Sequence, residues 1–496
     1  MEPLPSLEPI KIRFETMTQY LVQKIVKDTQ HSLTKSVPLA NFGPLVCTVV
    51  GARDRDIQRA SHSKGRKMVS RVIENAGESR ASALATTGII GVMFFIFGFV
   101  TWLNGPLITF VKFAFTLDDV SAFMVPMVFY MSYFFLALPS AMVLRRTGMK
   151  RGMTLGLFIM ALGAVLFGQM ATMRIFPGAL AGLFVIGAGL AILQTAANPY
   201  ISIVGPIESA AQRIAVMGIC NKLAGILAPI VIGTLVLHGV GELDAQIRAA
   251  PDSIAREALL DAFAANIHWP YMGMAGILAL LGLFVLRSPL PDIQPEEASV
   301  ERGDKGAGLL AFPHLWFGAL CLFLYVGVEV MAGDAIGPYG QSLGLPIEET
   351  AFYTSFTLAG MLLGYLVGLV LIPRFVSQER YLALSAALGV VLVICSYLSS
   401  GYLSVGCIAA LGFANAMMWP AIFPLAIRQL GRHTETGSAI LIMAICGGAV
   451  LPQLFAMLKQ HMDFQLVFLL IMAPAYCYIL FFGIWGSRIK QVEAAR

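Results

Sequence analysis

The chain has 496 residues, of which 57% are hydrophobic and 13% charged, with a mean hydropathy of +0.76 and a net charge of +5. These values exclude an ordinary soluble domain and indicate an integral membrane protein. From Ala85 onward, long apolar runs of about 20 residues predict roughly twelve membrane-crossing helices. The predicted fold class is therefore an all-α membrane protein, not a barrel.

The first 84 residues differ from the rest in charge. They contain thirteen of the 34 basic and eight of the 29 acidic residues, so the remainder carries 21 of each sign. The excess of basic residues favours a cytoplasmic location over a nucleic-acid site. We predict that residues 1–84 form a disordered cytoplasmic tail. The alternative that translation starts at Met68, so that residues 1–67 are not made, stays open.

Twelve apolar stretches follow the tail. The predicted spans are 86–111, 120–144, 153–173, 178–203, 211–238, 269–287, 314–335, 350–373, 381–400, 403–427, 438–458 and 465–486. A polar linker over 288–312 separates a six-helix bundle at 85–287 from a second at 313–486, with a cytoplasmic tail at 487–496. Two bundles joined in this way indicate a duplicated transporter that rocks about a central site.

Basic residues are concentrated in every second connection. The connection between the second and third spans contains Arg145, Arg146, Gly148, Lys150 and Arg151. The positive-inside rule then places both termini in the cytoplasm.

Two amides lie within an otherwise apolar span. Gln194 and Asn198 are four residues apart, so they lie on one helical face at membrane depth. Because lipid offers amides no hydrogen-bond partner, we expect them to face protein or a water-filled path. A neutral ligand with many hydroxyl groups is the kind of solute that such amides bind.

The run Gln194-Thr195-Ala196-Ala197-Asn198-Pro199-Tyr200 is followed by Gly205-Pro206, Arg213 and Asn221. This pattern resembles the fucose, glucose and galactose–proton symporter family of the major facilitator superfamily, over about residues 85–486. The resemblance implies two pseudo-symmetric six-helix bundles with a hexose bound between them, along a path lined by helices one, four, seven and ten. The basic connection at 145–151 is similar to the superfamily's inner loop, which implies a gating role for it.

The chain departs from the fucose branch at two acids. It has Gly105 where that symporter has an aspartate after a Leu-Asn pair, and Gln194 where that symporter has a glutamate. Neither residue can exchange a proton near neutral pH, so that coupling scheme does not transfer.

The seventh span supplies two other acids. Glu329 lies deep among apolar residues, where desolvation suits it to proton exchange. The alternative is an ionised acid paired with Lys222, for which a structural pairing role is expected. Asp334 lies nearer the outer end, where we expect a solvated helix end or a gate, and it is the second candidate for proton coupling. The segment from Tyr325 to Asp334 resembles the glucose, galactose and N-acetylglucosamine branches more than the fucose branch.

Amides and aromatic rings suit a sugar's hydroxyl groups and apolar faces respectively. The predicted substrate-binding residues are Asn104, Gln194, Asn198, Asn221, Asn415, Trp102, Tyr325 and Trp419. Structural interpretations stay open for several of them. Asn198, for example, precedes a proline and could satisfy backbone carbonyls that the proline leaves without a donor.

We therefore predict a monomeric, lipid-embedded transporter of the bacterial-type inner membrane that imports a hexose, or N-acetylglucosamine, by proton symport. A fucose-type or other small polar substrate, sodium coupling, uniport and a non-transporting sugar sensor remain as alternatives. The sequence offers no nucleophile with a base, no metal-ligand spacing among His or Cys residues and no nucleotide loop. We expect no enzyme activity, cofactor, metal or nucleic-acid partner.

Overall fold

The computed structural model describes residues 86–203, 210–290, 309–372, 375–428, 430 and 433–489, and within these ranges the regular structure is helical throughout. The expected tail at 1–84, most of the linker at 288–312 and most of the tail at 487–496 lie outside the described residues. Eleven helices are long and apolar enough to cross a membrane, and a bent pair makes a twelfth.

The long helices follow the predicted spans closely. In chain order they are the first helix (Thr86–Ala114, whose last part is α3, Asn104–Ala114), α5 (Met124–Thr147), α6 (Met149–Thr172), α7 (Phe176–Ile203), α8 (Ala210–Leu235), α11 (His268–Arg287), α12 (Pro313–Gly333), α15 (Tyr353–Leu371), α16 (Gln378–Leu398), α17 (Gly401–Asn415) with α18 (Met418–Ala426), α19 (Thr434–Met443) with α20 (Gly447–Leu458), and α21 (Phe464–Ile484). Shorter elements are α4 (Asp119–Ala122), α9 (Val240–Ala249), α10 (Ser253–Ala265), α13 (Ile336–Ser342), α14 (Ile347–Thr350) and the 3₁₀ turn η5 (Ala444–Cys446).

The tenth and eleventh spans, which the sequence predicted as continuous helices, are each interrupted, the eleventh by η5 between α19 and α20. The tenth span bends by 41° between α17 and α18. Pro420, in the first turn of α18, has no N–H to donate to the carbonyl of Ala416, which accounts for a break at this point. The seventh span ends at Gly333, and the chain turns at Asp334 before α13 begins.

The helices pack in two groups. In the first group, α6 packs against α7 and α11, and α5 against α7; in the second, α16 packs against α21 and α17, and α12 against α20. The groups meet along two seams, where α5 packs against α19 and α20, and α8 packs against α15.

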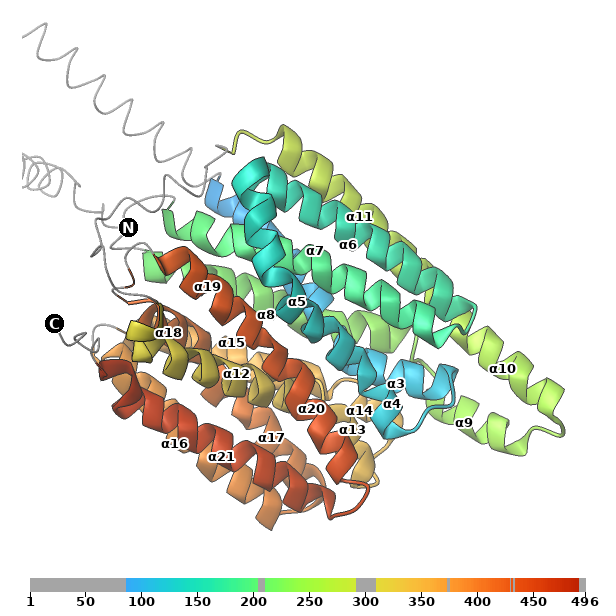
Figure 1. Cartoon of the computed structure of the whole chain (residues 1–496). Coiled ribbons are helices and arrows are strands. Elements are labelled where there is room, and N and C mark those ends of the chain that lie inside the picture. Colours follow the sequence, from blue (N-terminus) through green and yellow to red (C-terminus); the bar gives the residue numbers. More distant parts are fainter. Residues whose placement is uncertain are drawn as a thin grey trace, which may run out of the picture. The chain divides into compact units, whose positions relative to one another are not determined.

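Polar contacts join the two groups at one end of the helices, the end at which Figure 1 shows α3, α4, α13 and α14. Asp119 of α4 pairs with Lys459, Nζ to Oδ2, at 2.6 Å, and with Lys112 at 2.5 Å. The Gly241 backbone N–H donates to Glu348 Oε1 at 2.7 Å, and Gln341 Nε2 donates to Thr109 Oγ1 at 3.3 Å. We call this end, defined by these contacts, the closed end.

One glycine sets the spacing of a helix pair close to the middle of the bundle. A Cβ added to Gly447, the first residue of α20, would lie 1.8 Å from the carbonyl oxygen of Phe323 on α12. No other residue type fits there without moving the backbone, so Gly447 permits the close approach of α12 and α20.

Candidate functional site

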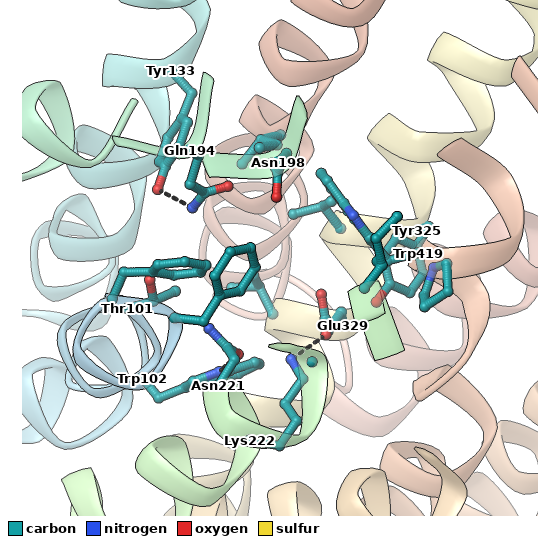
Figure 2. A pocket seen from close by; sticks show the side chains of 18 of the residues that line it. Thr101, Trp102, Tyr133, Gln194, Asn198, Asn221, Lys222, Tyr325, Glu329 and Trp419 are labelled. Carbon is teal, nitrogen blue, oxygen red and sulfur yellow. Dashed lines mark hydrogen bonds and ion pairs between the residues drawn. The ribbon is translucent and has the colours of Figure 1, made fainter. Parts of the chain in front are cut away.

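A cavity of about 120 Å³ lies between the two helix groups, which is room for several water molecules. Its walls come from the first helix, α5, α7 and α8 on one side, and from α12, α15, α18 and η5 on the other (Figure 2). Along the first helix the lining residues run from Phe94 to Trp102, whereas the closed-end contacts begin at Thr109. The cavity therefore lies about 10 Å along the axis from the closed end, at 1.5 Å per residue.

Gln194 and Asn198, the amide pair on α7, both line this cavity. Gln194 Nε2 donates to the hydroxyl of Tyr133 on α5 at 2.9 Å, which fixes the direction of the amide. Figure 2 shows both amides on the same side of the cavity, with Gln194 beside Tyr133. The Gln194 carbonyl takes no part in the bond to Tyr133, and it offers a hydrogen-bond acceptor to a ligand.

Asn221 and Lys222 of α8 add polar groups to the cavity, and both lie close to Trp102 of the first helix. Trp102 Nε1 donates to Asn221 Oδ1 at 3.4 Å, and the ammonium of Lys222 lies 4.5 Å from the centroid of the Trp102 ring. Trp102 is only 3% exposed because glycines of α8 and α12, Gly225 and Gly333, let its ring lie against the backbone of both helices.

Lys222 and Glu329 form a buried ion pair across the cavity wall. Lys222 Nζ lies 2.9 Å from Glu329 Oε1, and the two side chains are 8% and 11% exposed. The pair joins α8 to α12, one helix from each group (Figure 2). At this distance the two side chains attract each other across the boundary between the helix groups.

Aromatic rings form much of the remaining wall. Tyr325 of α12 and Trp419 of α18 line the cavity from the second group, and Trp419 stacks on Phe423 with 5.8 Å between centroids. Rings that flank a few directed amides can pack against the apolar faces of a pyranose while the amides bond its hydroxyl groups.

The structure therefore places six of the eight predicted substrate-binding residues on one cavity: Trp102, Gln194, Asn198, Asn221, Tyr325 and Trp419. It places Asn104 and Asn415 elsewhere. Asn104 donates to the Thr101 carbonyl at 3.1 Å within its own helix, and Asn415 accepts from Tyr476 at 2.8 Å in a contact with no exposed surface. Both amides are buried outside the lining of this cavity, and their assignment to the sugar site stays a prediction.

The expectation of a solvated position for Asp334 is wrong. The residue is 1% exposed, and Gly105 of the first helix packs against it, with an added Cβ there only 3.3 Å from Asp334 Oδ1. It does not line the cavity, unlike Glu329 and Lys222.

The basic connection at 145–151, predicted to act in gating, contains a single residue outside the helices. Arg145 and Arg146 belong to the last turn of α5, and Lys150 and Arg151 to the first turn of α6. Gly148 alone joins the helices, with φ of 78°, a backbone conformation that favours glycine. Lys150 Nζ donates to the Ser288 carbonyl at 2.6 Å, which ties this corner to the end of α11.

Sequence reasoning missed several lining residues: Phe94, Phe97, Thr101, Tyr130, Tyr133 and Tyr365. They come from helices one, two and eight, so the cavity is lined by helices beyond one, four, seven and ten, which the resemblance implied for the sugar path. Isolated aromatic residues in apolar spans give no signal of the direction they face. The tyrosines lay within predicted spans, but nothing in their spacing indicated a cavity.

No three His, Cys, Asp or Glu side chains come together as metal ligands among the residues that the structure describes. The polar groups that line the cavity include amides, hydroxyls and an ion pair, a set suited to binding a solute by hydrogen bonds without covalent chemistry.

Residues 90–452 match the Major Facilitator Superfamily. The chain belongs to this family. It is therefore a multi-pass membrane transporter and not an enzyme, and the two helix groups are the two bundles of the superfamily fold.

The relatives whose names are known are also transporters. The chain is 32% identical to a glucose/galactose transporter of Brucella abortus over 401 residues, 80% of this chain and 93% of that protein. It is 28% identical to the L-fucose-proton symporter of Escherichia coli over 387 residues, 76% of this chain and 87% of that protein. Among solved structures, the transporter FucP in its outward conformation matches with a TM-score of 0.65 and 26% identity, covering 81% of this chain and 99% of that one.

Proposed function

We propose that the chain transports a hexose across the bacterial inner membrane together with protons. The observation that carries this proposal is the meeting of three amides, Gln194, Asn198 and Asn221, in a cavity walled by aromatic rings between the two bundles. Paired amides bond vicinal hydroxyl groups, and rings bind the apolar faces of a pyranose. The names of the relatives support a sugar as the substrate.

We propose a glucose- or galactose-type hexose, or N-acetylglucosamine, in preference to fucose. The relative with 32% identity is a glucose/galactose transporter, and the fucose–proton symporter is more distant at 28%. The chain also has Gln194 and Gly105 at the two positions where the fucose branch has acids.

Transport would proceed by alternating access, with the bundles at 85–287 and 313–486 rocking about the cavity. The contacts at the closed end join the two bundles there, and they must separate for a sugar to pass that end. Basic residues on the connections at the opposite end favour the cytoplasm for that end and for both termini. The closed end would then face the outside, and this conformation would be the one shut to the outer solution.

Coupling to protons would use the acids of the seventh span, Glu329 and Asp334, because the two positions used by the fucose branch lack acids. The named fucose–proton symporters support proton coupling in general.

The test is sugar counterflow and uptake with purified protein in proteoliposomes. Vesicles preloaded with unlabelled sugar should take up labelled glucose or galactose, and unlabelled competitors should rank the hexoses. An imposed inward proton gradient should drive accumulation without sodium. Binding with no counterflow would identify a sensor and overturn the transport proposal, and accumulation that needs sodium would overturn proton coupling.

A further inference from the structure

Asp334 is a buried acid that the sugar cavity does not use. It occupies the turn between α12 and α13, is 1% exposed, and neither carboxyl oxygen has a hydrogen-bond partner among the residues that the structure describes. Such a group on a membrane-spanning chain is expensive to keep ionised, because desolvation penalises the charge and no hydrogen bond offsets that cost.

The first helix, from the other bundle, packs directly against this carboxyl. A Cβ added to Gly105 would lie 3.3 Å from Asp334 Oδ1 and 2.7 Å from the hydroxyl of Thr354. The backbone N–H of Gly105 gives the carboxyl some electrostatic stabilisation, but its geometry falls short of a hydrogen bond. The Thr354 hydroxyl instead donates to the Gly333 carbonyl at 2.8 Å.

Other charged or titratable groups act on Asp334 from both bundles. Glu329 repels an ionised Asp334 and Lys222 attracts it, and these two are already paired with each other at 2.9 Å. Tyr130 of α5, which lines the cavity, is the third such group. The ion pair is neutral overall, so it offers Asp334 little net compensation for losing water.

We propose that Asp334 is the proton-binding residue of the transport cycle; this rests on the proposed function. It takes a proton from the outer solution while the closed end is open, must be neutral for that end to shut, and gives the proton up to the cytoplasmic side from the shut conformation. Closure brings Gly105 against Asp334 and excludes water, which requires the neutral acid. Loss of the proton to the cytoplasmic side leaves a carboxylate without water, so the ionised protein favours reopening, in which the first helix moves away and water reaches the carboxyl. The shift of protonation with conformation links proton movement to the alternation of the bundles.

Asp334→Asn is the central test, since the amide imitates the protonated acid permanently. In proteoliposomes the variant should keep sugar counterflow, because exchange needs no net proton movement. It should lose accumulation driven by a proton gradient, and it should lose the alkalinisation of the medium that accompanies sugar entry. Asp463→Asn is the matched control: it makes the same change at an exposed N-cap, where asparagine caps as well as aspartate, and should behave as wild type.

A spectroscopic measurement covers the case in which Asp334→Asn fails to fold. Infrared spectra of the wild-type protein at about pH 7 should contain the carbonyl band of a protonated carboxylic acid, since exposed acids are ionised at that pH. Asp334→Glu should retain a shifted band of the same kind, and Asp463→Asn should leave the band unchanged.

Two results would overturn the inference alone, with wild-type counterflow and proton-driven accumulation intact: an accumulating Asp334→Asn variant, or no protonated-acid band. Absence of counterflow for every hexose in the wild type would instead overturn the proposed function, whatever Asp334 does.

Discussion

Lys222 of α8 and Glu329 of α12 are held 2.9 Å apart in the wall of the cavity, so one buried ion pair links the two bundles. Each charge depends on the other, because both side chains are nearly sealed from water. The two residues are 107 positions apart in the chain.

Glu329→Gln should destabilise the protein by about 3–5 kcal/mol, since it leaves the Lys222 ammonium buried without its counter-charge. The double variant Lys222→Met with Glu329→Gln removes both charges and should recover most of that loss. Thermal unfolding in detergent measures both effects. Equal melting temperatures for the single variant and the wild type would show that the pair contributes nothing to stability.

The double variant Lys222→Met with Glu329→Gln also tests whether Glu329 or Asp334 carries the coupling proton. With the proton carried by Asp334, it should still accumulate sugar under a proton gradient, although with lower sugar affinity because Glu329 lines the cavity. Retained counterflow without accumulation would place the coupling proton on Glu329.

Gln194→Ala should weaken sugar binding about tenfold, which corresponds to the loss of roughly one hydrogen bond. Tyr133→Phe should weaken it less, because it removes only the bond that directs the Gln194 amide. Titration calorimetry with the preferred hexose measures both affinities. Gln169→Ala on the exposed face of α6 is the matched control, and a wild-type affinity for Gln194→Ala would remove Gln194 from the site.

Asp119→Lys should shift the conformational equilibrium toward the form in which the two bundles separate at the closed end. The change replaces two attractions, to Lys459 and Lys112, with repulsion among three ammonium groups. Because Asp119 is partly solvated, with its side chain 27% exposed, we expect a shift of about 1 kcal/mol, or about fivefold in the population ratio.

Distances between spin labels on Ser121 and Gln460, near the contact, would report this shift and should lengthen in the variant. Raising the salt concentration should produce a smaller change in the same direction in the wild type, since salt screens solvent-accessible charges. Unchanged distances in Asp119→Lys would show that the ion pairs do not hold this end shut.

Hydrophobic run length predicted the spans well because a helix must satisfy its own backbone in lipid, which leaves little freedom in where it starts and ends. The direction of the α7 amides was predicted on the same ground, because Gln194 and Asn198 had to face away from lipid. Asn415 met that requirement differently, by bonding to Tyr476 on another helix. A sequence shows that a polar side chain needs a partner, but the partner depends on how helices pack.

The same limit applies to Asp334. Its position near the end of the seventh span suggested solvent, and the sequence gives no sign that Gly105, 229 positions earlier, closes over it. Burial here is a property of the packing between bundles and not of the local sequence.

Gly447→Ala should destabilise the protein by more than about 2 kcal/mol, because the added Cβ would lie 1.8 Å from the Phe323 carbonyl and the backbones of α20 and α12 would have to separate. Gly276→Ala, on α11, is the matched control, since a Cβ there meets nothing within 4 Å and alanine favours a helix over glycine. Thermal unfolding of the two variants should therefore diverge, with Gly276→Ala at or slightly above the wild-type melting temperature. A Gly447→Ala variant as stable as Gly276→Ala would mean that α20 shifts readily against α12, and that this contact does not restrain the two helices.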